Sequence, residues 1–362
     1  MKMNLQWNTH IALPSVNGQV NPGMAGAYTG ISDHYLIVAG GAFFPEAYPW
    51  DGGRKYWSKD IYIWDLKEKS GDKGWQYFEG QLPQAIAYGS SVTTPRGILC
   101  IGGCDAEKCY ADTYFMKMEN GKVCFTPWIP LPYPLANCCA SMIGNTIYVA
   151  GGQKSVINGS ATNVFLSIDM DKPQGGWQEL PAWDGPARGY AIGVAKAVNN
   201  VSCFYLFSGR NYSNDGAEVL FDAYCYNSET SQWRKLDGDF PLMAATGGNQ
   251  SGSKFILLAG GTDGAIFRKE IALREELKTC TIQEKKDSLQ MQLNHFLKHI
   301  EGFDNVMRWY DVEKELIVKT EKVSFPMPLT TTMVITLESF YIPSGEVRPG
   351  VRSPLIIQGI FK

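Results

Sequence analysis

The feature that most constrains this sequence is a short apolar run that ends in Gly-Gly or Ser-Gly and occurs six times. The copies lie at 35–41, 98–103, 147–152, 204–209, 255–261 and 340–345. Their last glycines are 62, 49, 57, 52 and 84 residues apart, and a period of about 50 residues is typical of propeller blades of the kelch type. Because each run is continuously apolar, we expect it to be a strand covered on both faces by neighbouring sheets.

A second signal alternates with the first, namely an outer strand that usually contains Trp and ends in Pro. Its copies lie at 7–14, 75–83, 128–132, 177–181, 233–241 and, without Trp, 316–326. The chain starts with this second signal alone and ends with the first signal alone. These incomplete units form one unit only if the chain closes into a ring, which removes the exposed sheet edges. The sequence therefore predicts an all-β fold, a six-bladed kelch-type β-propeller with an N-terminal strand closing the last blade.

The predicted blades make the whole chain, 1–362, a single propeller. They lie at about 24–83, 84–132, 135–181, 187–241, 243–326, and 329–362 together with 4–14. The fifth interval is too long, and 271–278 and 285–299 carry apolar residues at helical spacing. We therefore predict a helical insertion at about 265–305 in blade five, packed over one face of the ring, through which a homodimer could form. His295 and His299 stand four apart on it, but no third ligand is evident, so we predict no metal site.

Charge and composition exclude several classes of partner. The net charge is -3 and 19% of residues are charged, so no basic surplus favours nucleic acid or an anionic membrane. No run approaches the roughly 18 apolar residues of a membrane span. The N-terminus has no apolar signal segment, which predicts a cytoplasmic protein, or a periplasmic one if a secretion signal has been removed. The 9 Cys contain no CxxC pair and are interpreted as buried free thiols.

The loops that follow the Gly-Gly motifs and those that lead into the blades should open on one face of a propeller, where function is expected. The candidate site residues in these loops are Glu346, Arg348, Arg352, Arg188, Asn137, Tyr88 and Arg54. Glu346, Arg348 and Arg352 concentrate charge in one tight loop, which favours a functional role. For Arg188 and Tyr88, a structural ion pair and simple packing are the alternatives.

The segment 345–353 (GEVRPGVRS) resembles the G-E-x-[KR]-P-G-x-R segment of the sialic acid mutarotases (N-acetylneuraminate epimerases), which are kelch-type propellers. Residues 26–41 look like that family's G-x-x-G-I-S…L-I-F-A-G-G, and 55–64 (KYWSKDIYIW) is similar to its K-x-Y-S-x-D-I-x-x-W. The similarity extends over nearly the whole chain, but in rotated order. It therefore indicates the circularly permuted branch of the family.

The resemblance implies an isomerase of carbohydrate metabolism that interconverts the α and β anomers of N-acetylneuraminic acid, a small acidic sugar, without a cofactor or a metal. Glu346 matches the family's proton acceptor. Arg352 would bind the sugar carboxylate through the parallel N–H donors of its planar guanidinium, assisted by Arg348 or Arg188. For the acid that protonates the ring oxygen, water and a Tyr are both candidates. The main alternative is a non-catalytic kelch propeller that binds a glycan or a protein partner. A copper radical oxidase is disfavoured because the chain has only 4 His.

Overall fold

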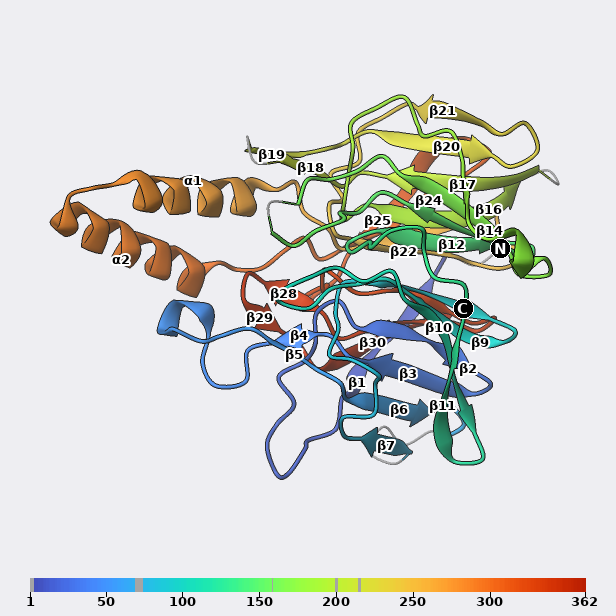
Figure 1. Ribbon diagram of the computed structural model, residues 1–362, viewed down its shortest axis with the longest axis horizontal. Coiled ribbons are helices and arrows are strands. Elements are labelled where there is room, and N and C mark those ends of the chain that lie inside the picture. Colours follow the sequence, from blue (N-terminus) through green and yellow to red (C-terminus); the bar gives the residue numbers. More distant parts are fainter. Residues whose placement is uncertain (1–2, 69–73, 158, 199–200, 214–215) are drawn as a thin grey trace.

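The computed structural model describes residues 3–68, 74–157, 159–198, 201–213 and 216–362. Among these residues, six sheets of four antiparallel strands form the blades of a propeller (Figure 1). The first strands of all six sheets line one central channel. The predicted fold class, a six-bladed β-propeller with a helical insertion in blade five, is confirmed.

Each blade has the same order of strands from the channel outward. The innermost strands are β2 (Tyr28–Ser32), β8 (Ser90–Thr94), β12 (Cys139–Ile143), β16 (Ile192–Val198), β22 (Thr246–Asn249) and β26 (Val334–Ile335). The second strands are β3 (Tyr35–Ala39), β9 (Gly97–Ile101), β13 (Thr146–Ala150), β17 (Val201–Phe207), β23 (Phe255–Ala259) and β27 (Ser339–Pro343). The third strands are β6 (Ile61–Asp65), β10 (Thr113–Glu119), β14 (Phe165–Asp169), β20 (Ala223–Asn227), β24 (Val306–Asp311) and β30 (Leu355–Phe361). The outermost strands are β7 (Trp75–Phe78), β11 (Lys122–Pro127), β15 (Gln178–Glu179), β21 (Gln232–Leu236), β25 (Leu316–Lys322) and β1 (Leu5–Ala12).

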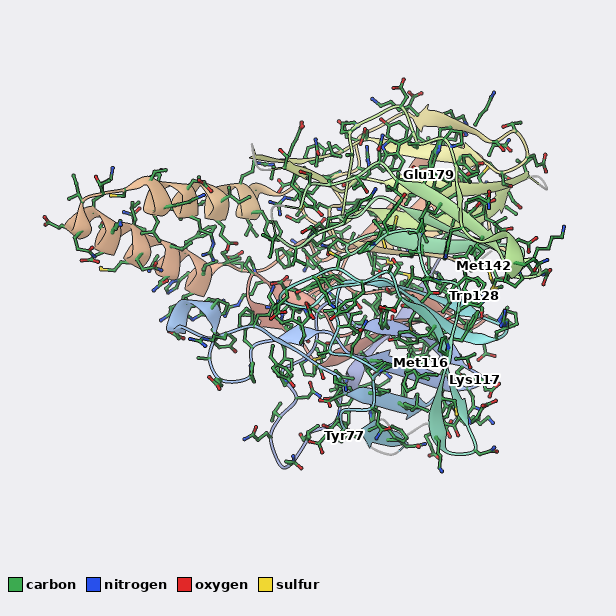
Figure 2. The ribbon with its side chains drawn as sticks, in the orientation of Figure 1. Tyr77, Met116, Lys117, Trp128, Met142 and Glu179 are labelled. Carbon is green, nitrogen blue, oxygen red and sulfur yellow. The ribbon has the colours of Figure 1, made fainter. Side chains whose placement is uncertain are left out.

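The six apolar runs supply the second strands. β9 and β23 are buried along their whole length because a neighbouring blade covers each face, and side chains fill the space between the ribbons (Figure 2). Residues alternate between the two faces of a strand. On β10, for example, Met116 is fully buried, whereas the next residue, Lys117, forms an ion pair with Glu119. The core is therefore a series of layers between blades.

The N-terminal strand closes the ring. β1 pairs with β30 in antiparallel register, with Leu5 opposite Phe361. The Trp7 ring lies edge-on against Phe340 at 5.6 Å between centroids, and its indole N–H donates to Glu321 of blade five at 3.0 Å. The strand that begins the chain thus joins the last blade to the fifth blade as well.

The Gly-Gly or Ser-Gly pair that ends each second strand lies in close contact with the next blade. At Gly40 the backbone has φ 68, and an added Cβ would lie 2.6 Å from the carbonyl oxygen of Ile86 in the next blade. In blade six the same position is Ser344, which is fully buried at φ 57. Its Oγ accepts a hydrogen bond from the Met24 N–H at 2.7 Å and donates to the Ser353 carbonyl at 2.7 Å. These bonds compensate for a left-handed conformation that non-glycine residues otherwise avoid.

A closed circle of backbone hydrogen bonds surrounds the channel, and we call it the neck ring. One residue of each blade takes part, always with a left-handed φ between 51 and 68. The members are Gly26, Tyr88, Asn137, Tyr190, Ala244 and Thr330. Each N–H donates to the carbonyl of the preceding member at 2.7 to 3.1 Å, and Gly26 completes the circle by donating to Thr330. The ring fixes where each innermost strand begins.

Four smaller elements extend from one end of the propeller. They are the strand pairs β4 (Ala42–Phe43) with β5 (Tyr56–Trp57), β18 (Arg210–Ser213) with β19 (Gly216–Val219) and β28 (Glu346–Arg348) with β29 (Val351–Arg352), and the 3-10 helix η1 (Pro49–Asp51). Another 3-10 helix, η2 (Pro173–Gly175), belongs to blade three. The short pairs follow the Gly-Gly or Ser-Gly motifs, so they share the face on which the site was predicted.

The insertion between β23 and β24 is a helical hairpin of α1 (Ala265–Thr279) and α2 (Gln283–His299). It extends away from the sheets at the end that carries β4, β5, β28 and β29 (Figure 1). Leu293, Leu297 and Ile300 form a small apolar cluster with Trp50 of η1. This narrow base holds the hairpin, because most of the remaining helix surface is polar and exposed.

The neck ring gives a test of the fold. In Gly26→Ala the new Cβ would lie 2.6 Å from the Tyr88 backbone nitrogen at φ 68. We expect the free energy of unfolding, measured by urea denaturation, to fall by about 2–4 kcal/mol, from conformational cost and overpacking together. Gly18→Ala is the matched control, because Gly18 has φ 76 with open space around it, and it should lose only about 1 kcal/mol. Equal losses would contradict a special role for the ring.

Candidate active site

A cavity of about 330 Å³ lies where β28–β29, the β4–β5 loop and the base of the helical hairpin meet. We call it the upper cavity. Its charged lining residues are Lys55, Arg210, Arg274, Arg352, Glu270 and Glu346. Four cations against two carboxylates leave an excess of positive charge, which favours an anionic ligand.

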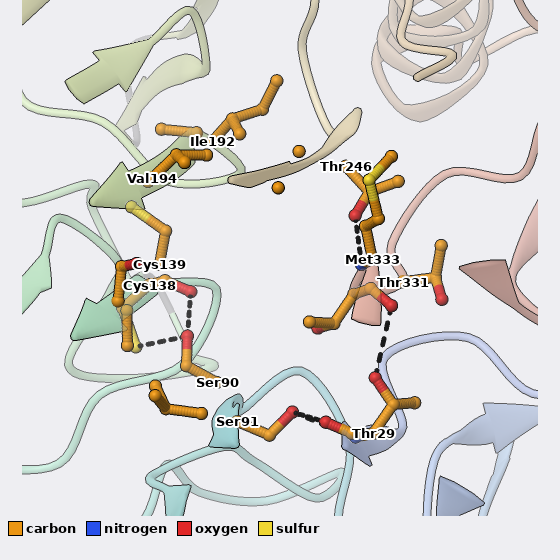
Figure 3. A pocket seen from close by; sticks show the side chains of 18 of the residues that line it. Thr29, Ser90, Ser91, Cys138, Cys139, Ile192, Val194, Thr246, Thr331 and Met333 are labelled. Atoms are coloured by element: carbon orange, nitrogen blue, oxygen red, sulfur yellow. Dashed lines mark hydrogen bonds between the residues drawn. The ribbon is translucent and has the colours of Figure 1, made fainter. Parts of the chain in front are cut away.

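A second cavity of about 330 Å³, the channel cavity, is lined by the innermost strands of the six blades (Figure 3). The two cavities share four members of the neck ring, Tyr88, Tyr190, Ala244 and Thr330. The channel cavity has no charged lining residue. Hydroxyls in its wall bond between blades, as where Ser91 Oγ donates to the Thr29 carbonyl at 2.8 Å. Ionised side chains for acid–base chemistry are therefore found in the upper cavity.

Glu346 and Arg352 face each other across a short hairpin. The register of β28 with β29 places them directly opposite, a position at which side chains of a strand pair interact. The Arg352 Nη1 lies 3.4 Å from the Glu346 Oε1, and the Gly350 N–H donates to the same oxygen at 2.8 Å. Oε2 of Glu346 has no hydrogen bond with the described part of the chain. The turn thus orients the carboxylate and leaves one oxygen for a ligand.

The guanidinium of Arg352 is buried but incompletely satisfied. The residue is 9% exposed, and its Nε donates to the Ala42 carbonyl at 3.3 Å. The face of the guanidinium lies 4.7 Å from the centroid of the Phe44 ring. Nη1 is buried without a hydrogen-bond partner among the described residues. Since buried donors are nearly always paired, this group is suited to an oxygen of a ligand.

Tyr88 and Lys55 border the same end of the cavity. Burial raises the pKa of Tyr88 to about 12; the guanidinium of Arg352 opposes this effect and Glu346 adds to it. The ammonium of Lys55 lies 5.4 Å from the centroid of the Tyr88 ring and 5.7 Å from that of Trp57. Lys55 is exposed as a whole residue, but partial desolvation of its ammonium and the charge of Arg352 lower its pKa, with Glu346 acting the other way. The carboxylate of Glu346 and the cations of Arg352 and Lys55 therefore lie around the side chain of Tyr88.

The helical insertion provides the opposite wall. Phe267, Glu270 and Arg274 of α1 and Leu297 of α2 line the upper cavity. The Nε of Arg274 donates to Glu270 Oε1 at 2.9 Å, so the wall offers a preformed polar pair beside apolar side chains. A ligand bound at Arg352 would extend toward this pair.

Three of the predicted residues, Glu346, Arg352 and Tyr88, come together in the upper cavity. Asn137 instead lines the channel cavity. Its Nδ2 donates to Gln153 Oε1 at 3.1 Å, and its buried Oδ1 has no partner among the described residues. Asn137 thus lies in the neck ring, on the channel side of the predicted site.

Arg188 has a structural environment. It is fully buried, and its guanidinium forms a fork with both carboxylate oxygens of Asp222, at 2.8 and 3.1 Å. It also donates to the Ser208 carbonyl at 2.8 Å. Arg188 lines neither cavity. The contacts of Arg188 are therefore those of a structural ion pair, which was the alternative interpretation of this residue.

Arg348 and Arg54 also lie outside both cavities. Residues two apart on a regular strand share a face, but the register of β28 with β29 shifts between Glu346 and Arg348, so Arg348 does not follow Glu346 into the cavity. Its Nη1 donates to the Lys298 carbonyl at the end of α2, at 2.9 Å, and its guanidinium lies 5.4 Å from the Trp50 ring centroid. It therefore fixes the base of the hairpin. Arg54 and the following residue, Lys55, are both exposed, but only Lys55 lines the upper cavity.

Several lining residues were not among the predicted site residues. Arg210 directly follows the Ser-Gly motif of blade four, so the rule that selected Glu346 could have selected it. Lys55 adjoins Arg54 just before β5 (Tyr56–Trp57), and no repeat signal decides between the two. Glu270 and Arg274 lie on the insertion, and no repeat signal indicates which side of a helix faces the channel.

The described residues contain no group of three or more His, Cys, Asp or Glu side chains that could hold a metal ion. His295 and His299 stack at 4.1 Å between ring centroids on α2. No helix in the described part of the chain is both long and apolar enough to cross a membrane.

The fold and the site define a β-propeller that presents one carboxylate and several cations at one end of its channel. The family model described as N-acetylneuraminate epimerase matches residues 1–125 and 128–362. The chain belongs to the N-acetylneuraminate epimerase family.

Curated relatives agree with this assignment, and a solved structure has the same fold. An N-acetylneuraminate epimerase of Vibrio vulnificus is 34% identical over 241 residues, which are 62% of this chain and 57% of the relative. One of Yersinia enterocolitica is 35% identical over 212 residues, 56% of this chain and 51% of the relative. The matches thus span little more than half the length of these relatives. A solved structure described as "Structure of YjhT" has a TM-score of 0.63 at 12% identity, covers 93% of this chain and 94% of that chain, and shows the fold.

The pair of Arg188 and Asp222 predicts how stability depends on pH. Burial alone would raise the pKa of Asp222, but the hydrogen bonds and charge of Arg188 hold it below its usual range. The contribution of the pair to stability is therefore fully present above about pH 4, the pKa of an unfolded Asp, and is lost as pH falls through the lowered pKa. In Asp222→Asn we expect a loss of about 3–5 kcal/mol at pH 7 and a weaker acid dependence, both measured by urea denaturation.

The matched control is Asp239→Asn, because Asp239 is an exposed carboxylate of the same blade. It should change the free energy of unfolding by no more than about 0.5 kcal/mol. A similar small change in Asp222→Asn would show that the pair contributes little to stability.

Proposed function

We propose that this protein is a sialic acid mutarotase, an isomerase that interconverts the α and β anomers of N-acetylneuraminic acid. The observation that carries the proposal is the ion pair of Glu346 and Arg352. One oxygen of the carboxylate, Oε2, has no hydrogen bond with the described residues, and the buried Nη1 of Arg352, 3.4 Å from Oε1, also lacks a hydrogen-bond partner among them. Membership of the N-acetylneuraminate epimerase family and the names of the relatives support it.

Arg352 would bind the carboxylate of the sugar. A guanidinium presents two parallel N–H donors that match the two oxygens of a carboxylate, and such charge-assisted bonds are about twice as strong as neutral ones. Phe44 and the Ala42 carbonyl fix the plane of the group. Since the guanidinium is already desolvated, binding would satisfy Nη1 at little additional cost.

Glu346 would act as the base. In mutarotation the anomeric hydroxyl loses its proton, the bond from the anomeric carbon to the ring oxygen breaks, and the open-chain ketone closes again on its other face. The anomeric carbon also carries the carboxylate, so a sugar held by Arg352 would present its hydroxyl to Glu346 on the opposite strand. A positioned base contributes about 10²- to 10⁴-fold to such a step.

We also propose that the chain is a circular permutation of the family's usual order. The sequence alignments cover 57% and 51% of the relatives, while the structural match covers 93% and 94% of the two chains. A collinear alignment of a rotated sequence matches one part at a time, which accounts for the difference. The test is to rotate the sequence by one whole blade at a time, beginning with 329–362 moved ahead of residue 4, and to align each rotated sequence again. Unchanged coverage of the relatives would refute the permutation.

Removing the base gives the first test of the function. Glu346→Gln keeps the shape of the side chain, so we expect KM to change little and kcat to fall by about 10²- to 10⁴-fold. The rate is measured by proton NMR, following α-N-acetylneuraminic acid freshly released by a sialidase as it approaches the β form. Glu338→Gln is the control, since Glu338 is an exposed residue in the turn at the other end of the same blade.

A wild-type rate equal to that of the protein-free sample would overturn the mutarotase. If the resonances of the sugar broadened under those conditions, the chain would be a propeller that binds an acidic sugar without converting it. Loss of activity in Glu338→Gln as well would show that the effect is not specific to the site.

The wall formed by α1 should contribute to binding and not to chemistry. In Arg274→Met we expect KM to rise by about 3- to 10-fold, the value of one exposed polar contact, with kcat unchanged. Arg268→Met is the matched control, because Arg268 lies on the same helix, bonds to the Asp263 carbonyl and does not line the cavity. Steady-state kinetics of both variants decide the matter. A fall in kcat alone in Arg274→Met would contradict a binding role.

A further inference from the structure

The proposed mutarotase needs an acid as well as a base. When the bond to the ring oxygen breaks, that oxygen must receive a proton, and Glu346 is already assigned to the anomeric hydroxyl. The inference below therefore rests on the proposed function and concerns the missing acid.

The chemistry of the substrate limits where the acid can be. One carbon carries the carboxylate, the anomeric hydroxyl and the ring oxygen, so all three groups lie within bonding distance of one point. If Arg352 holds the carboxylate and Glu346 faces the hydroxyl, the acid must lie beside both. Glu270 and Arg274 of the α1 wall pair with each other, and neither is among the charged groups that act on Lys55, whereas Arg352 and Glu346 are.

Few groups of the upper cavity can give up a proton at this place. Arginine does not lose its proton in proteins, which excludes the guanidinium groups. Burial raises the pKa of both Tyr88 and Tyr190, which makes each a weaker acid. Lys55 remains, and it interacts electrostatically with both Arg352 and Glu346.

The backbone delivers Lys55 to this point. It immediately precedes β5, whose pairing with β4 is fixed by Ala42 opposite Trp57. Ala42 also accepts the hydrogen bond from Arg352, so one short strand pair positions both cations. The Lys55 ammonium lies over the Tyr88 ring at 5.4 Å. It makes no hydrogen bond or ion pair with the described residues, so its protons are available to a ligand.

We propose that Lys55 is the general acid of the reaction. Glu346 takes the proton of the anomeric hydroxyl, whose electron pair forms the carbonyl while the bond to the ring oxygen breaks. The ring oxygen takes a proton from the Lys55 Nζ. After the open chain rotates, the free hydroxyl attacks the other face of the carbonyl and returns its proton to Lys55. The carbonyl oxygen takes the proton back from Glu346, so no oxidant, metal or cofactor enters the balance.

The surroundings of Lys55 strengthen it as an acid. Although the residue as a whole is exposed, partial desolvation of its ammonium and the charge of Arg352 lower its pKa, whereas Glu346 and the Cys104 thiol act in the opposite direction. The rings of Tyr88 and Trp57 also face the ammonium, and the remaining charged groups of the cavity are Arg210, Glu270 and Arg274. A general acid is most effective when its pKa approaches the working pH, so this shift favours Lys55 over Tyr88, whose pKa is raised to about 12.

The decisive variant is Lys55→Arg, which keeps a positive charge but cannot transfer a proton near neutral pH. We expect KM within about 3-fold of wild type, as for a conserved charge, and kcat lower by about 10²- to 10⁴-fold. The NMR assay is run from pH 6 to about pH 10, with the protein-free rate subtracted. In wild type kcat should fall on the alkaline side, below the usual lysine pKa of about 10.4, as Lys55 loses its proton. In Lys55→Arg this alkaline fall should disappear.

Lys59→Arg is the matched control, because Lys59 lies in the same segment and outside the cavity; it should behave as wild type. Lys55→Arg with a wild-type kcat and an unchanged alkaline fall would overturn the inference while leaving the mutarotase intact. A rise in KM alone would likewise overturn it and make Lys55 a residue that only binds the carboxylate. No acceleration by the wild-type protein would overturn the proposed function, and this inference with it.

Discussion

The structure depends on the neck ring, the closed circle of backbone hydrogen bonds from Gly26 through Tyr88 and Asn137 to Thr330. A hydrogen bond between adjacent blades is local, but a circle of them can close only when every blade is present. Each member has a left-handed φ, which costs about 1–2 kcal/mol for a residue other than glycine. The ring offsets this cost because it fixes the distance of all six blades from the channel and their positions around it.

The ring also accounts for the position of the candidate site. Tyr88 and Tyr190 belong to it and border both cavities, so the ring separates the uncharged channel cavity from the charged upper cavity. Rigid backbone below and short strand pairs at the sides hold Glu346, Arg352 and Lys55. Such preorganised groups act on developing charge without having to rearrange. The helical hairpin completes the upper cavity and belongs to one blade only. The site therefore lacks the symmetry of the ring that carries it.

Residues that share a sequence position need not share a role. Arg188 and Tyr88 both lead into a blade, yet Arg188 turns inward to Asp222 while Tyr88 borders the cavity. Arg348 and Arg352 lie four residues apart in one hairpin, but the former bonds to the end of α2 and the latter to Ala42. The expectation that these loops open on one face of the propeller therefore located the site and several of its residues. It could not separate side chains that bind a ligand from side chains that hold the structure together.

The sequence by itself determined the blades, their number and the closure of the ring, because those follow from apolar periodicity and from contacts along single strands. It also indicated that Glu346 and Arg352 lie close together, since a tight turn joins them, although the same turn sends Arg348 to the end of α2. Only the tertiary structure decided that Lys55 and not Arg54 reaches the cavity, that Arg188 is an internal ion pair, and that α1 supplies a wall. These outcomes depend on the direction of side chains between segments far apart in the chain, and no local pattern encodes that direction.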